Sequence, residues 1–146
     1  MKCQHILVPV DFSPDAERAL DYAIALAQQF QARLTILHII HIPVTTDVDL
    51  SSYYGEMEIS AQQGLATYQK QIADAGLTAD VAIMRGTPFR EIVDVATNQQ
   101  VDLIIMGTHG RTGLQHLLLG SVAERVVRLA PCTVMVTRED KSHAVS

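Results

Sequence analysis

Runs of aliphatic residues alternate with amphipathic stretches along most of the chain. The first run, residues 5–10, is almost uninterrupted aliphatic, which is typical of a strand that is covered on both faces. Four further runs rich in aliphatic and β-branched residues predict strands at 32–42, 79–86, 101–107 and 132–138. We therefore expect five strands.

Apolar residues at three- and four-residue steps predict a helix after each of the first four strands. The first helix begins at Pro14, because Ser13 can cap it and proline at the first helical position needs no amide partner. Its predicted apolar stripe comprises Ala16, Ala19, Leu20, Ala23, Ala27 and Phe30.

The other three helices have boundary signals of their own. A second apolar stripe runs over residues 57–75 and stops at Gly76, whereas residues 43–55 have no period and predict a surface connection. The third helix starts after Thr87, and its inner residues are predicted to be Phe89, Ile92, Val93 and Ala96. The fourth covers 121–131, where Ser121 and Glu124 have the spacing of a capping box.

This alternation predicts one α/β domain at residues 1–138, a doubly wound five-stranded parallel sheet flanked by four helices. A polar C-terminal tail is expected at 139–146. Ligands of such sheets bind beyond the carboxyl ends of the strands, where the winding reverses direction. The candidate site therefore lies at the ends of the first, second and fourth strands.

Composition and charge exclude several classes of partner. The net charge of −5 argues against nucleic acid as a partner, because phosphate backbones are bound by clustered Lys and Arg. No apolar run approaches the roughly 20 residues of a spanning helix, and the N-terminus lacks a signal-peptide layout, so we expect a cytoplasmic protein without membrane insertion. Cys3 and Cys132 are interpreted as small buried hydrophobic residues.

Asp11 is a carboxylate at the end of the first strand and has two equally supported interpretations. It can accept hydrogen bonds from a ribose hydroxyl or an adenine amino group. It can also form the turn into the first helix and help to cap it, which is a common role of aspartate.

A glycine-rich loop follows the fourth strand. Its spacing is Gly107-x-x-Gly110, nine residues, and then Gly120-Ser121 at the start of a helix. Glycines permit positive φ angles and close approach of a ligand, and loop amides next to a helix N-terminus favour a phosphate chain. A flexible connector is the alternative, but the full spacing and its place between strand and helix favour the phosphate site. The pattern is neither the Walker motif nor the dinucleotide fingerprint.

The segments "HILVPVDFS", "LTILHI", "GTPFREIVDVA", "VDLIIMGTHGRTGL" and "LLGSVAERVVRLAPCTVMV" together resemble the universal stress protein family, in its ATP-binding subgroup. The glycine spacing matches that subgroup's G-2x-G-9x-G-S/T pattern. The resemblance covers nearly the whole chain and implies a Rossmann-like fold of the adenine nucleotide alpha hydrolase type.

The resemblance also implies a role for individual residues. Pro9, Val10 and Asp11 would line the nucleoside, and Ile39 would contact adenine. The implied ribose, loop and phosphate contacts are Met106, Gly107, His109, Gly110, Gly120, Ser121 and Val122. No catalytic residue and no metal ligand is assigned.

Other polar and aromatic residues near the site keep two interpretations each. His109 and Arg111 could touch phosphate or a bound metal, or could face solvent. His38 is interpreted as a hydrogen-bonded core histidine rather than a ligand. Tyr53 and Tyr54, in the long connection, could close over the nucleotide or pack on the surface.

The function implied is that of a regulatory stress-response protein that binds ATP, or ADP or AMP, with Mg²⁺ or Mn²⁺. Its implied partners are a protein and a second copy, paired through the last strand at about 132–137, or a higher oligomer. The site offers no lysine and no carboxylate pair for Mg²⁺, so it is better suited to holding ATP than to splitting it. The alternatives are slow ATP hydrolysis, autophosphorylation on Ser121 or Thr112, cyclic AMP binding, and an interaction module that needs no nucleotide.

Overall fold

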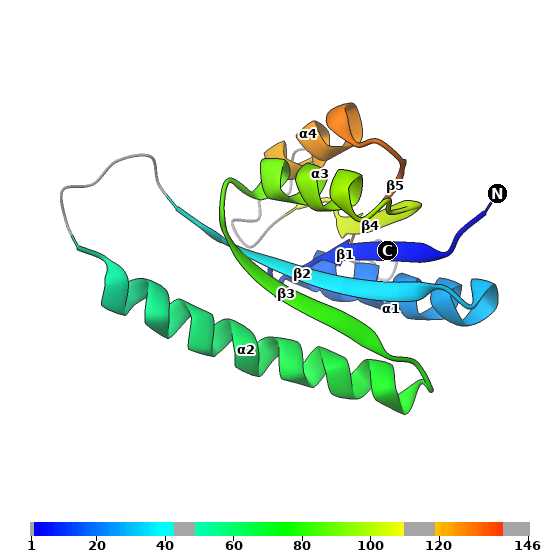
Figure 1. Ribbon diagram of the computed structural model, residues 1–146, viewed down its shortest axis with the longest axis horizontal. Coiled ribbons are helices and arrows are strands. Elements are labelled where there is room, and N and C mark those ends of the chain that lie inside the picture. Colours follow the sequence, from blue (N-terminus) through cyan, green and yellow to red (C-terminus); the bar gives the residue numbers. More distant parts are fainter. Residues whose placement is uncertain (1, 43–48, 110–118, 139–146) are drawn as a thin grey trace, which may run out of the picture.

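A computed structural model of the chain describes residues 2–42, 49–109 and 119–138. It contains one sheet of parallel strands in the order β3-β2-β1-β4-β5 (Figure 1). The strands are β1 His5–Pro9, β2 Arg33–His41, β3 Ala79–Gly86, β4 Leu103–Gly107 and β5 Thr133–Thr137. The predicted doubly wound fold is confirmed, and the winding reverses between β1 and β4.

Helices cover both faces of this sheet. They are α1 Pro14–Phe30, α2 Ser51–Asp74, α3 Pro88–Asn98 and α4 Ser121–Leu129. Figure 1 shows α1 and α2 on one face, and α3 and α4 on the other. Alternate residues of β1 point to opposite faces of the sheet. Ile6 and Val8 pack with α1 and α2, whereas Leu7 packs with α3 and α4. This double burial explains why the strand reads as an uninterrupted aliphatic run.

The start of α1 follows the prediction, but its end does not. Ser13 is the N-cap residue, and its Oγ accepts a 3.2 Å hydrogen bond from the amide of Ala16, with Pro14 at the first helical position. Phe30, which was predicted to lie on the apolar stripe, is 42% exposed. It is the last residue of the helix, directly before Gln31 turns the chain into the left-handed region, where the helical stripe no longer continues.

Two boundary predictions are wrong. The second helix begins at Ser51 rather than at 57, because the Asp49 carboxylate accepts the Ser51 amide at 3.0 Å and sets the first turn. Tyr53 and Tyr54 are therefore helical residues, while 43–48 lie outside the described residues. The predicted capping box is also absent, since Gly120 is the N-cap residue of α4 and Ser121 is already helical.

Both cysteines pack as small apolar residues. Cys3 is buried in the core on the α1 side, and Cys132 is half-buried against the core on the α3 side. Burial raises the pKa of both thiols, which keeps them protonated and unreactive at neutral pH. Of the helices in the described ranges, none combines the length and apolar character needed to cross a bilayer.

Candidate nucleotide pocket

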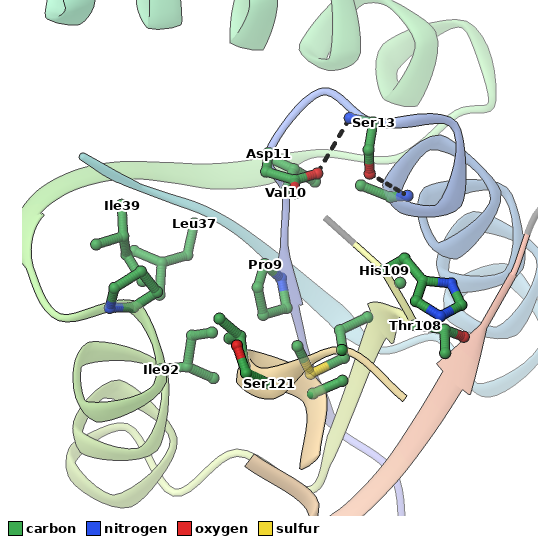
Figure 2. A pocket seen from close by; sticks show the side chains of 17 residues that line it. Pro9, Val10, Asp11, Ser13, Leu37, Ile39, Ile92, Thr108, His109 and Ser121 are labelled. Carbon is green, nitrogen blue, oxygen red and sulfur yellow. Dashed lines mark hydrogen bonds between the residues drawn. The ribbon is translucent and has the colours of Figure 1, made fainter. Parts of the chain in front are cut away.

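A pocket of about 260 Å³ lies at the carboxyl ends of β1 and β4, where the winding of the sheet reverses (Figure 2). The sequence predicted this location. All the predicted nucleotide-binding residues that the structure describes line it: Pro9, Val10, Asp11, Ile39, Met106, Gly107, His109, Gly120, Ser121 and Val122. Gly110, Arg111 and Thr112 lie outside the described residues.

One side of the pocket is apolar. Leu37 and Ile39 of β2 lie beside Ile92 of α3, with Pro9 between them and the glycine loop (Figure 2). The contribution of α3, which also includes Pro88, was not predicted. A signal for it exists in the sequence, because a helix that directly follows a parallel strand starts at the same edge of the sheet at which the strand ends.

Polar side chains also line the pocket. Thr108 and His109, from the start of the glycine loop, lie across Pro9 from Ile39, whereas Ser121 of α4 lies close to Ile92 in this view (Figure 2). In α4 the first intrahelical bond runs from the amide of Glu124 to the carbonyl of Gly120 at 2.9 Å, and among the described residues no side chain caps the helix. Gly120, Ser121, Val122 and Ala123 line the pocket, and amides in the first turn of a helix lack intrahelical acceptors and favour negative charge.

Asp11 makes the predicted turn and also lines the pocket. Its Oδ1 accepts a 3.0 Å hydrogen bond from the amide of Ser13 (Figure 2), so the turn interpretation is confirmed. The carboxylate is half-buried, and a carboxylate can accept more than one hydrogen bond. The turn therefore leaves Asp11 able to accept a bond from a ligand hydroxyl or amino group.

Gly107 and Gly120 are required by packing rather than by the backbone angles that the sequence suggested. Among the described glycines only Gly76 and Gly86 have positive φ. A Cβ on Gly107 would lie 2.8 Å from the Cβ of Asp15, and a Cβ on Gly120 would lie 2.7 Å from the carbonyl oxygen of Thr108. These two glycines therefore let the β4 end and the α4 start close tightly around the pocket.

A hydrogen-bonded cluster around Thr108 and His109 joins β4, β5 and the first turn of α1. The backbone amide of His109 donates to Oδ2 of Asp15 at 3.0 Å, and the imidazole Nδ1 lies 3.5 Å from the same oxygen. The Oγ1 of Thr137 donates to the Asp15 carbonyl at 3.1 Å, and the Thr108 hydroxyl donates to the Thr137 carbonyl at 2.6 Å. The sequence did not single out Asp15 or Thr137.

The structure also decides between the alternatives left open for the histidines and tyrosines near the site. His38 is on the opposite face of β2, and its Nδ1 lies 2.8 Å from the carbonyl oxygen of Val10, which confirms the hydrogen-bonded interpretation. His109 is only 11% exposed at its side chain, so the solvent-facing interpretation is wrong. Tyr54 packs on the surface, where Cζ of Arg85 lies 5.5 Å from the centroid of the Tyr54 ring.

The charges near the pocket do not form a metal-binding cluster. In residues 2–42, 49–109 and 119–138, no three His, Cys, Asp or Glu side chains come together as ligands of one ion. Nor does the described lining include a lysine. These side chains therefore suit a ligand that is held by apolar contact and by backbone amides.

Comparisons with known proteins agree with this fold. A model of the universal stress protein family matches residues 2–138. Universal stress protein MJ0531 of Methanocaldococcus jannaschii is 34% identical over 142 residues, covering 93% of this chain and 82% of that protein. The structure of universal stress protein UspA from Lactobacillus plantarum is 30% identical with a TM-score of 0.86, covering 94% of this chain and 99% of that chain. The structure of the Archaeoglobus fulgidus universal stress protein in complex with dAMP is 25% identical with a TM-score of 0.70, covering 94% and 99%.

Proposed function

We propose that this chain, which belongs to the universal stress protein family, binds ATP in the pocket between β1 and β4 as a nucleotide-dependent regulator. The observation that carries the proposal is that apolar side chains of β2 and α3 and the start of α4 line the same pocket. A purine base needs an apolar slot, and a phosphate chain needs amides and a helix N-terminus. That the Archaeoglobus fulgidus relative was solved with dAMP supports an adenine nucleotide as the ligand.

Each part of the nucleotide has a matching part of the pocket. We place adenine between Ile39 and Ile92, with the ribose beside Asp11 and Met106. The phosphates then lie over the amides at Gly120, Ser121 and Val122, completed by Gly110 of the predicted motif. The described lining encloses about 260 Å³, just below the roughly 300–1,000 Å³ of small-ligand sites.

Holding ATP is the proposed activity, and hydrolysis is not required for it. Phosphoryl transfer needs charge neutralisation at the phosphates by a metal or by Lys and Arg. The described residues do not fit a resident Mg²⁺ or Mn²⁺, because they bring no three ligands together. A divalent ion would therefore enter on the phosphates of the nucleotide itself.

Nucleotide binding is proposed to act through self-association and a protein partner in the cytoplasmic stress response. The strand β5 is at the edge of the sheet, and its Val136 is 37% exposed. Val127 and Leu129 of α4 are 48% and 52% exposed. An exposed edge strand can pair with the same strand of a second copy. Because α4 also begins at the pocket, a change in the phosphates can reach this surface through one short helix.

The proposal is tested by identifying what the purified protein carries. Denaturation followed by mass spectrometry is expected to release an adenine nucleotide, or to do so after incubation with ATP and Mg²⁺. Ile39→Ala removes an apolar contact to the base and should weaken retention, whereas Ile59→Ala, at a site 58% exposed on α2, should not. Sedimentation velocity of nucleotide-loaded and nucleotide-free protein then tests the proposed dimer. Identical profiles would refute the regulation of self-association by nucleotide.

A further inference from the structure

Phe12 has an unusual backbone conformation between two residues of the pocket. Its φ is 65°, in the left-handed region that side chains disfavour. It stands between Asp11 and Ser13, both of which line the pocket. Such a conformation persists only where the surrounding structure holds it, and this residue is held from the opposite face of the sheet.

The Phe12 ring is seated in a small cage formed by β2 and α2. Its centroid lies 4.8 Å from that of the His38 ring and 5.7 Å from that of the Tyr68 ring, to which it is inclined by 26°. The third residue that surrounds the ring is Gly64 of α2. A Cβ on Gly64 would lie 2.5 Å from Cε1 of Phe12, so glycine provides the space that the ring occupies.

The backbone next to Phe12 is fixed to the same elements. The amide of Val10 donates to the carbonyl of Leu37 at 2.8 Å. The carbonyl of Val10 accepts from Nδ1 of His38, also at 2.8 Å. Both backbone polar groups of Val10 are therefore bonded to β2, and the ring of Phe12, two residues later, packs against α2.

We propose that Phe12 is a positioning residue for the nucleotide pocket. We further propose that α2 sets the affinity of the pocket for ATP through the contact between Gly64 and the Phe12 ring, on the far face of the sheet. The inference rests on the proposed function. If the Phe12 ring loses its contacts with α2 and β2, the φ angle of Phe12 relaxes from the left-handed region. The Asp11 carboxylate then turns away from the nucleoside. The pocket then binds only in the fraction of molecules that keep the seated conformation.

The test compares two glycines of the same helix. Gly64→Ala places a methyl group against the ring, whereas Gly55→Ala is the matched control, since a Cβ there meets nothing within 4 Å. Calorimetric titration with ATP should give a dissociation constant raised by about tenfold for Gly64→Ala, if about a tenth of the molecules keep the competent conformation. Gly55→Ala should bind as the native chain does. Adenosine should lose affinity by the same factor, because the change is at the nucleoside end.

A double-variant cycle separates positioning from general damage. Phe12→Leu removes the ring and should itself weaken ATP binding, and adding Gly64→Ala to it should weaken binding no further, because the methyl group then has no ring to displace. Equal ATP affinity of Gly64→Ala and Gly55→Ala overturns the inference. If Gly64→Ala does not fold, unchanged ATP affinity of Phe12→Leu overturns it. A native protein that binds no ATP would instead refute the proposed function, and the inference with it.

Discussion

The backbone amide of His109 donates a 3.0 Å hydrogen bond to Oδ2 of Asp15, which ties the start of the glycine loop to the first turn of α1. The two residues are 94 positions apart in the sequence. Because Asp15 is buried, this bond closes the polar end of the pocket in a protected environment. The carboxylate thus fixes the backbone of His109, which lines the pocket beside the proposed phosphate site.

Asp15→Ala should lower the free energy of unfolding by about 1–3 kcal/mol, because it leaves a partly buried amide without this acceptor. Asp15→Asn retains an acceptor oxygen and should lose less. Urea unfolding of both variants checks the order, with Asp94→Ala, an exposed acid on α3, as the control. Equal stability of Asp15→Ala and Asp94→Ala would show that the bond contributes nothing.

Gly107→Ala and Gly120→Ala should each cost about 1–3 kcal/mol of unfolding free energy, because the added methyl group overlaps backbone or side-chain atoms. The matched substitution Gly55→Ala should stabilise the chain by up to about 1 kcal/mol, since alanine favours a helix and space is open there. Chemical denaturation of the three variants tests this. The packing explanation fails if Gly107→Ala and Gly120→Ala are as stable as Gly55→Ala.

The Tyr68 hydroxyl should make stability fall at high pH. Burial, aided by the negative charges of Glu17 and Asp11, raises the pKa of Tyr68 from 10.0 to about 12. The unfolded chain releases this proton near pH 10 and the folded chain only near 12, so the contribution is complete below pH 10 and is lost between 10 and 12. An ultraviolet titration of the phenols should show one late transition, which Tyr68→Phe removes.

The same variant tests a buried polar atom. Among the described residues the Tyr68 hydroxyl has no hydrogen-bond partner. Removing an unsatisfied buried hydroxyl while keeping the ring should leave the free energy of unfolding at neutral pH unchanged or raise it. A loss of more than about 1 kcal/mol on Tyr68→Phe would show that the hydroxyl is in fact bonded.

His5 should make stability fall on mild acidification. The Arg33 guanidinium can only donate, so Nδ1 of His5 accepts its 3.1 Å bond and Nε2 donates to Thr35 Oγ1 at 2.7 Å. Burial, and then the charge of Arg33, lower the pKa of His5 below 6.5. Below pH 6.5 the unfolded chain takes up a proton that the folded chain resists, so stability declines as pH falls.

Urea unfolding at pH 7.5 and 5.5 checks the role of His5. The loss of stability between these values should be smaller in His5→Phe, which cannot be protonated, than in the native chain. His41→Gln, which removes an exposed histidine, is the control and should keep the native pH dependence. If His5→Phe keeps it as well, another group is responsible.

The sequence predicted the strands, the helix order and the place of the pocket because each depends on local periodicity and on one general rule of parallel sheets. Asp11, which directly follows the first predicted strand, and Ser121, which begins the fourth predicted helix, could be placed at the pocket for the same reason, whereas Ile39 was assigned to it through the family resemblance. The resemblance then supplied their roles, which remain proposals.

What could not be predicted depends on contacts between residues far apart in the chain. The need for glycine at 107 comes from Asp15, and that at 64 comes from Phe12, neither of which any local pattern reveals. The early start of α2 at Ser51 was missed because its first two turns bury no residue and so show no apolar period. Tertiary packing, rather than propensity, sets these features.

The central claim is that the pocket between β1 and β4 binds ATP. The most direct test is calorimetric titration of folded, nucleotide-free protein with ATP and Mg²⁺ at two temperatures, so that a vanishing enthalpy at one of them cannot hide binding. We expect saturable binding of one ATP per chain, weakened by Ile39→Ala and not by Ile59→Ala. No saturable heat at either temperature with millimolar ATP would contradict it.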